Sequence, residues 1–113
     1  MEYHEKIQDG VALISLKGPF LSEPDALAMR KHFYKLVDER VIRIVMDLRD
    51  VTHINSCGLG LLVSVLTTLK RSGGQLRLAR VQANVRSVLS VTGLVLIFDL
   101  FDTMEEAMES LNR

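Results

Sequence analysis

The order of apolar and polar positions along the chain predicts five strands. Short apolar runs, partly β-branched and bounded by turn residues, are typical of strands. The first two runs flank Asp9-Gly10, a pair that favours a tight hairpin turn. The third is apolar at nearly every position, as in a central strand buried on both faces. The predicted strands cover residues 3–7, 11–17, 41–47, 75–79 and 96–100.

Between these runs, apolar residues recur at three- and four-residue steps, which predicts helices with one buried face. The first helix opens at Ser22-Glu-Pro-Asp25, where Ser22 is a candidate cap, and stops near Arg40. The second opens at Ser56 or Cys57 and ends at Ser72-Gly-Gly74. Thr103-Met-Glu-Glu106 is a capping box for the last helix. The predicted buried stripes are Ala26, Met29, Phe33, Leu36 and Val37; Leu59, Leu62, Val63, Leu66 and Lys70; Val81, Val85, Val88 and Leu89, in a short helix ending at Gly93; and Met104, Ala107, Met108 and Leu111.

The resulting order of elements is ββαβαβαβα. Strands that alternate with helices imply right-handed crossovers and parallel pairing in the later part of the chain. We therefore predict an α/β fold, an open mixed β-sheet of about five strands with about four helices. At 113 residues, the expected organisation is a single domain over 1–113.

Composition narrows the classes of function. Lys plus Arg and Asp plus Glu number 14 each, so the formal net charge is zero. A broad nucleic-acid surface would need an excess of basic residues. An anionic membrane likewise offers a neutral chain no attraction. We expect neither direct nucleic-acid binding nor membrane attachment.

The single cysteine, Cys57, excludes a disulfide within the chain and favours a reducing compartment. Near a helix start it is either a reactive thiol or a small buried residue, and the usual burial of free cysteine favours the second. The first ten residues are polar and unlike a signal peptide. No apolar run approaches the roughly 20 residues that cross a bilayer. These features predict a cytoplasmic protein without membrane insertion.

Residues 47–62 read DLRDVTHINSCGLGLL, an apolar strand end, a short loop and a glycine-containing helix start. This segment resembles the signature of STAS domains, the fold of the bacterial anti-sigma factor antagonists. The resemblance extends over nearly the whole chain. It includes Gly18, Gly73-Gly74, the V-x-x-V-L-x-x-T-G-L spacing at 85–94 and the E-E-A-M-x-S-L run at 105–111.

The resemblance implies a partner switch. Such a protein binds an anti-sigma factor with serine-kinase activity, is phosphorylated on one serine, and is restored by a serine phosphatase. The matching phosphoacceptor is Ser56, and Gly58 and Gly60 match the glycines of the signature. Two positions of the motif differ from the pattern, since Asn55 stands where an acid is usual and Cys57 where a second serine is usual. The acid expected after Gly18 is also missing.

Physical chemistry supports a charge-bearing role for Ser56. A phosphate there would lie at a helix N-terminus, which favours anions. The structural alternative is that Ser56 is simply the N-cap. If Leu59 and Leu62 face the sheet, Leu61 and Val65 point away and form an apolar docking stripe. The predicted partner-binding residues are Asn55, Ser56, Cys57, Gly58, Leu59, Gly60, Leu61 and Val65.

Other classes of function find little support. His4, His32 and His53 have no metal-ligand spacing, so no metal site is expected. The run at 57–60 lacks the third glycine of a dinucleotide fingerprint, and no hydrolase triad is evident. We therefore expect no cofactor and no enzyme. The alternative that stays open is a STAS scaffold or a subunit of a larger signalling or lipid-transport assembly, in which Ser56 is never modified.

Overall fold

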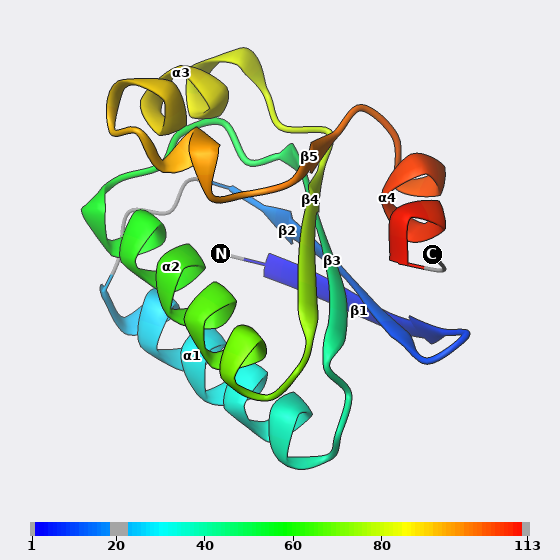
Figure 1. Ribbon diagram of the computed structural model, residues 1–113. Coiled ribbons are helices and arrows are strands. Elements are labelled where there is room, and N and C mark those ends of the chain that lie inside the picture. Colours follow the sequence, from blue (N-terminus) through cyan, green and yellow to red (C-terminus); the bar gives the residue numbers. More distant parts are fainter. Residues whose placement is uncertain (1, 19–22, 112–113) are drawn as a thin grey trace.

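The computed structural model describes residues 2–18 and 23–111 (Figure 1). Five strands form one sheet in the order β1-β2-β3-β4-β5. Strands β1 and β2 pair antiparallel, whereas β2, β3, β4 and β5 pair in parallel. The predicted fold class and element order are confirmed. The elements are β1 (Glu2–Gln8), β2 (Val11–Lys17), α1 (Glu23–Asp38), β3 (Arg43–Asp50), α2 (Ser56–Arg71), β4 (Gln75–Ala79), α3 (Ala83–Val91), the 3-10 helix η1 (Leu94–Leu96), β5 (Leu100–Phe101) and α4 (Met104–Leu111).

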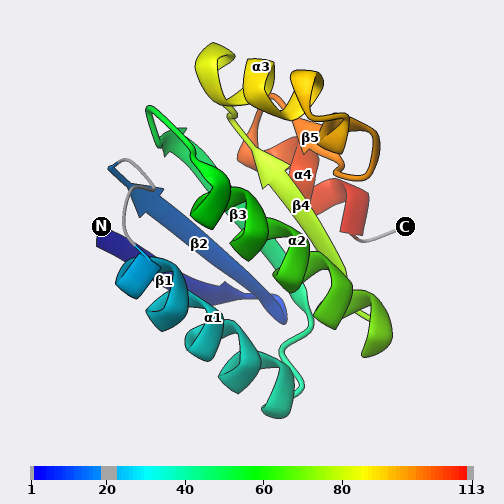
Figure 2. The ribbon, with the colours of Figure 1, turned by 90° about the vertical axis from the view of Figure 1, so that its left-hand side faces the viewer.

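The helices cover the sheet unequally. Helices α1 and α2 lie side by side on one face, and α4 packs on the other, while α3 lies beyond the carboxyl end of β4 (Figures 1 and 2). The larger core fills the α1/α2 face and includes Phe33, Met46 and Leu62. A smaller core under α4 includes Val45 and Leu111. Alternate residues of β3 thus enter different cores, as its continuous apolar run predicts.

The turns confirm several sequence expectations. Asp9 and Gly10 both have positive φ, 53° and 76°, as a tight hairpin turn between β1 and β2 requires. Helix α2 ends in a left-handed Gly73, and the Gly74 N–H donates to the Leu69 carbonyl at 2.6 Å, which is a Schellman C-cap. Helix α1 ends at Asp38, close to the predicted Arg40. The predicted cap Ser22 lies outside the described residues.

The predicted strand over 96–100 is wrong for most of its length. Residues 94–96 form η1, because Gly93 takes a left-handed φ of 76° and turns the chain back on itself. Leu96 and Ile97 are then exposed, and Phe98 enters the core. Only two residues, Leu100 and Phe101, pair with β4. An apolar run of this length did not distinguish a strand from a tight turn with one anchoring side chain.

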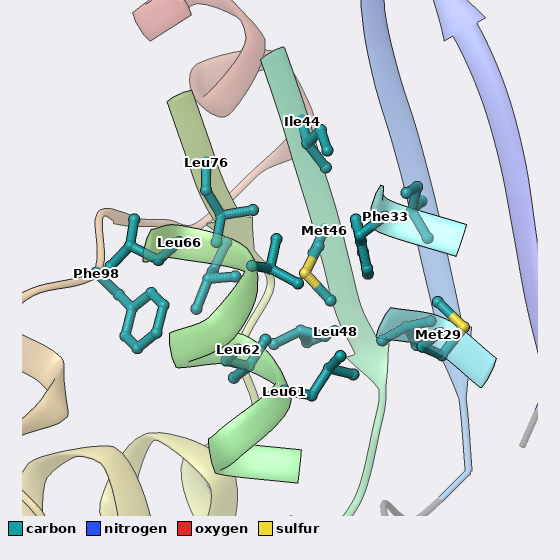
Figure 3. Close-up of a cluster of buried hydrophobic side chains, with 14 of the residues drawn as sticks. Met29, Phe33, Ile44, Met46, Leu48, Leu61, Leu62, Leu66, Leu76 and Phe98 are labelled. Atoms are coloured by element: carbon teal, nitrogen blue, oxygen red, sulfur yellow. The ribbon is translucent and has the colours of Figure 1, made fainter. Parts of the chain in front are cut away.

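The predicted buried stripe of α2 is displaced by about one residue. Leu61 and Val65 are 0% and 2% exposed, so the prediction that they point away from the sheet is wrong. Leu59 and Val63 are only half-buried, and Lys70 is exposed. The reason is that α2 packs against both the sheet and α1, which moves its buried face toward α1. Figure 3 shows Leu61 and Leu62 both directed toward Leu48 of β3.

Candidate functional site

The loop between β3 and α2 is anchored by two apolar side chains. Val51 and Ile54 are 0% and 9% exposed and belong to the larger core. Asn55 follows in an extended conformation, and its Oδ1 accepts a hydrogen bond from the Gly58 N–H at 3.1 Å. Asn55 is therefore the N-cap of α2, and its amide oxygen satisfies a donor that the helix leaves unpaired.

This assignment excludes the next residue, Ser56, as the N-cap. Ser56 is the first helical residue and not the N-cap, so the structural alternative for Ser56 is wrong. Its side chain is exposed, and its hydroxyl makes no hydrogen bond to any residue that the structure describes. The departure from the family pattern at Asn55 leaves the cap intact, because asparagine and aspartate both supply a capping oxygen.

A groove runs from Ser56 toward α1. Its volume is about 480 Å³, and it lies between the N-terminal turns of the two helices. A Cβ built on Gly60 meets nothing within 4 Å, so this glycine opens the groove to whatever approaches. Cys57 is half-buried, between the two alternatives weighed for it. The lining residues are Glu23, Pro24, Ala26, Leu27 and Arg30 of α1, and Ser56, Cys57 and Gly60 of α2.

Arg30 is the residue that the sequence did not single out. Its Nε is buried and has no hydrogen-bond partner among residues 2–18 and 23–111. Most arginines on an amphipathic helix extend into water, so no pattern within 23–38 distinguished Arg30 from Lys31. Its importance comes only from the packing of α1 beside α2, which places it in the same groove as Ser56.

The structure brings together only part of the predicted partner surface. Ser56, Cys57 and Gly60 line the groove, and Asn55 precedes them at the helix start. Gly58 is buried, and Leu59 is half-buried against the larger core. Leu61 and Val65 are core residues, so the predicted apolar docking stripe does not exist on this surface.

An ion pair supports the strand end from which the loop departs. Asp47, near the end of β3, is 5% exposed and accepts hydrogen bonds from the Arg80 guanidinium at the end of β4. The Arg49 N–H donates to the same carboxylate at 3.1 Å. The hydrogen bond to Asp47 raises the pKa of Arg80 above its ordinary value. These contacts tie the carboxyl ends of β3 and β4 together where the loop begins.

Known proteins share this fold, a mixed five-stranded sheet with two helices on one face. The model of the STAS domain family matches residues 4–107. The chain belongs to this family. A Thermotoga maritima protein named as a candidate anti-sigma factor antagonist is 32% identical over 108 residues, 96% of each chain.

Solved structures of other proteins share this fold. The crystal structure of a candidate anti-sigma factor antagonist from Thermotoga maritima superposes with a TM-score of 0.87 at 30% identity, covering 98% of this chain and 95% of the other. The phosphorylated form of SpoIIAA, a Bacillus cell fate determinant, shares the fold with a TM-score of 0.77 at 19% identity, covering 97% and 99%. None of the helices in the described ranges is both long and apolar enough for a transmembrane span.

Proposed function

We propose that this protein is an anti-sigma factor antagonist, a binding module and not an enzyme. The start of α2 and the adjacent groove bind an anti-sigma factor with serine-kinase activity, and phosphorylation of Ser56 ends that binding. A serine phosphatase restores the binding form. The observation that carries the proposal is the Ser56 hydroxyl, exposed beside an open groove and not used in the helix cap.

The position of Ser56 explains how a phosphate could regulate binding without unfolding the domain. A phosphoserine carries about −1.5 to −2 charges at pH 7. At the first turn of α2 the unpaired N–H groups and the helix dipole favour a negative charge. No acidic side chain lies in that turn to oppose it. The main effect of the phosphate therefore falls on the partner, through repulsion, bulk and the loss of hydration.

The partner surface in this proposal is the groove. Ser56, Cys57 and Gly60 form its α2 side, and Leu27 of α1 adds an exposed apolar side chain. Asn55 holds the helix start in place. Gly58 and Leu59 shape this surface through the backbone of the first turn of α2. Leu61 and Val65 hold that turn in place by packing in the core.

A direct experiment compares three variants for binding to the cognate anti-sigma factor. Ser56→Asp is expected to weaken binding at least tenfold, about 1.4 kcal/mol, because it places a charge at the contact. Ser56→Ala is expected to bind normally and to accept no phosphate from the kinase. Thr67→Asp, which adds the same charge to α2 about 16 Å further along its axis, is the matched control and should bind as wild type. Equal affinity of Ser56→Asp and wild type would refute the proposed contact.

A second candidate function rests on Asn55, which stands where the family usually has an acid. In this reading the chain is a STAS scaffold or a subunit of a larger signalling or lipid-transport assembly, and Ser56 is never modified. Intact-mass spectrometry of the protein from its native cells separates the two functions. A gain of about 80 Da mapped to Ser56, the mass of one phosphoryl group, supports the switch. An unmodified Ser56 under all growth and stress conditions supports the scaffold.

A further inference from the structure

Arg30 is half-buried on α1 and lines the groove beside Ser56. Its Nε is enclosed, and neither a hydrogen bond nor an ion pair of Arg30 is found within the described ranges 2–18 and 23–111. A guanidinium presents five N–H donors in a planar fork. Burying such a donor without a partner costs free energy, and the side chain that carries it lines the groove.

The packing of the two helices fixes where Arg30 lies relative to Ser56. Helices α1 and α2 run side by side in the same direction (Figure 2). The hydroxyl oxygens of Tyr34 and Ser64 lie 3.4 Å apart, so these residues face each other. Arg30 lies one turn before Tyr34, and Gly60 lies one turn before Ser64. Arg30 therefore faces Gly60, and Ser56 lies one turn closer to the N-terminus of α2, about 6 Å along its axis.

The α2 side of the groove is open at Gly60. Gly60 has no side chain, and a Cβ there would meet no atom within 4 Å. Both Arg30 and Ser56 line the same groove. A long arginine side chain and a phosphoryl group on Ser56 would thus extend into one shared space.

The charges around the groove favour this pairing. The lining residues include one acid, Glu23, which is exposed at the start of α1. Solvent screens the repulsion between such an exposed carboxylate and a phosphate. The buried part of the Arg30 guanidinium is screened less, and arginine binds phosphate through two parallel N–H bonds. The first turn of α2 adds its own N–H groups and no acid.

We infer that Arg30 receives the phosphoryl group of phosphorylated Ser56, so that the phosphate lies over Gly60 within the groove. This inference rests on the proposed phosphorylation of Ser56 and names the residue that binds the phosphate. Phosphorylation then blocks the partner by occupying its binding groove, and the backbone of the helices stays where it is. The added negative charge is partly neutralised inside the domain.

The test uses the full chain with phosphoserine installed genetically at position 56, which requires no kinase. A ³¹P NMR titration measures the second pKa of the phosphate. Pairing with a cation favours the dianion, so this pKa should be lower in the wild-type background than in Arg30→Gln. Lys31→Gln removes the same charge from the exposed neighbouring position on α1 and should leave the phosphate pKa unchanged. The Arg30 Nε–H resonance should also shift when Ser56 is phosphorylated.

A phosphate pKa that is the same in the wild-type and Arg30→Gln backgrounds would overturn the inference, as would an unmoved Nε–H resonance. If Arg30→Gln does not fold, Arg30→Lys replaces it. Lysine keeps the charge but loses the fork, so its phosphate pKa should rise above the wild-type value. Because the phosphoserine is installed without the kinase, a failure of Arg30 to bind it is distinct from a failure of cells to phosphorylate Ser56.

Discussion

Helices α2 and α4 each have a hydroxyl residue at their start, Ser56 and Thr103, and use it differently. At α4 the Thr103 hydroxyl accepts a hydrogen bond from the Glu106 N–H and donates one to the Glu106 carboxylate, both at 3.1 Å. At α2 the cap is Asn55, and Ser56 follows it with an exposed hydroxyl. The Thr103 hydroxyl caps its helix, while the Ser56 hydroxyl takes no part in a cap.

The difference shows what a helix start needs before it can act as a switch. The oxygen of a capping hydroxyl already accepts a backbone N–H, so phosphorylating that hydroxyl would change the group that caps the helix. When asparagine takes over the capping, the neighbouring serine can change its charge while the helix stays closed. Separation of the two roles by one residue thus allows regulation without unfolding.

The largest expected effect is on the free energy of unfolding, and it tests whether the first turns of α2 are anchored in the larger core. Leu61→Ala should lower the free energy of unfolding by about 2–5 kcal/mol, because a fully buried leucine leaves a cavity in the larger core. Leu59→Ala, at a half-buried position two residues earlier, should cost clearly less. Urea denaturation of both variants measures the difference. A larger loss for Leu59→Ala would return Leu61 to the surface and restore the apolar docking stripe.

The next effect compares the two caps directly. Asn55→Ala and Thr103→Ala should each lower the free energy of unfolding by about 1 kcal/mol, because each removes the acceptor for an unpaired helix N–H. Ser56→Ala should change it by less than about 0.5 kcal/mol, as expected for an exposed position outside the cap. Thermal and urea unfolding give all three values. A cost for Ser56→Ala equal to that of Asn55→Ala would mean that Ser56 also caps α2.

The smallest effect concerns the open space at Gly60. Gly60→Ala should raise the free energy of unfolding by about 0.5–1 kcal/mol, since alanine has the higher helix propensity and its Cβ meets no atom within 4 Å. Partner affinity should fall at the same time, because the methyl group enters the groove. Gly74→Ala is the contrasting control, because its Cβ would lie 2.2 Å from the Ile42 carbonyl oxygen and must destabilise the fold. An unchanged affinity for Gly60→Ala would place the partner elsewhere.

Local patterns determined most of the secondary structure. The Asp9-Gly10 hairpin, the Gly73-Gly74 helix end and the Thr103–Glu106 capping box each depend on a few adjacent residues, and all three were predicted. The strand predicted over 96–100 was wrong because its conformation depends on contacts that are distant in the sequence. Whether its apolar residues pair as a strand depends on the left-handed turn at Gly93 and on the packing of Phe98 in the core. The tertiary structure sets both.

The sequence by itself determined the fold class, the family and the segment that carries the candidate site. The tertiary structure decided which residue caps α2, which leucines are buried, and that Arg30 belongs to the site at all. Asn55 and Ser56 are both good caps, and leucines lie on two sides of α2, so periodicity left these choices open. The packing of α2 against α1 and the sheet resolves them, because it sets the rotation of the helix and brings together residues 26 positions apart in the chain.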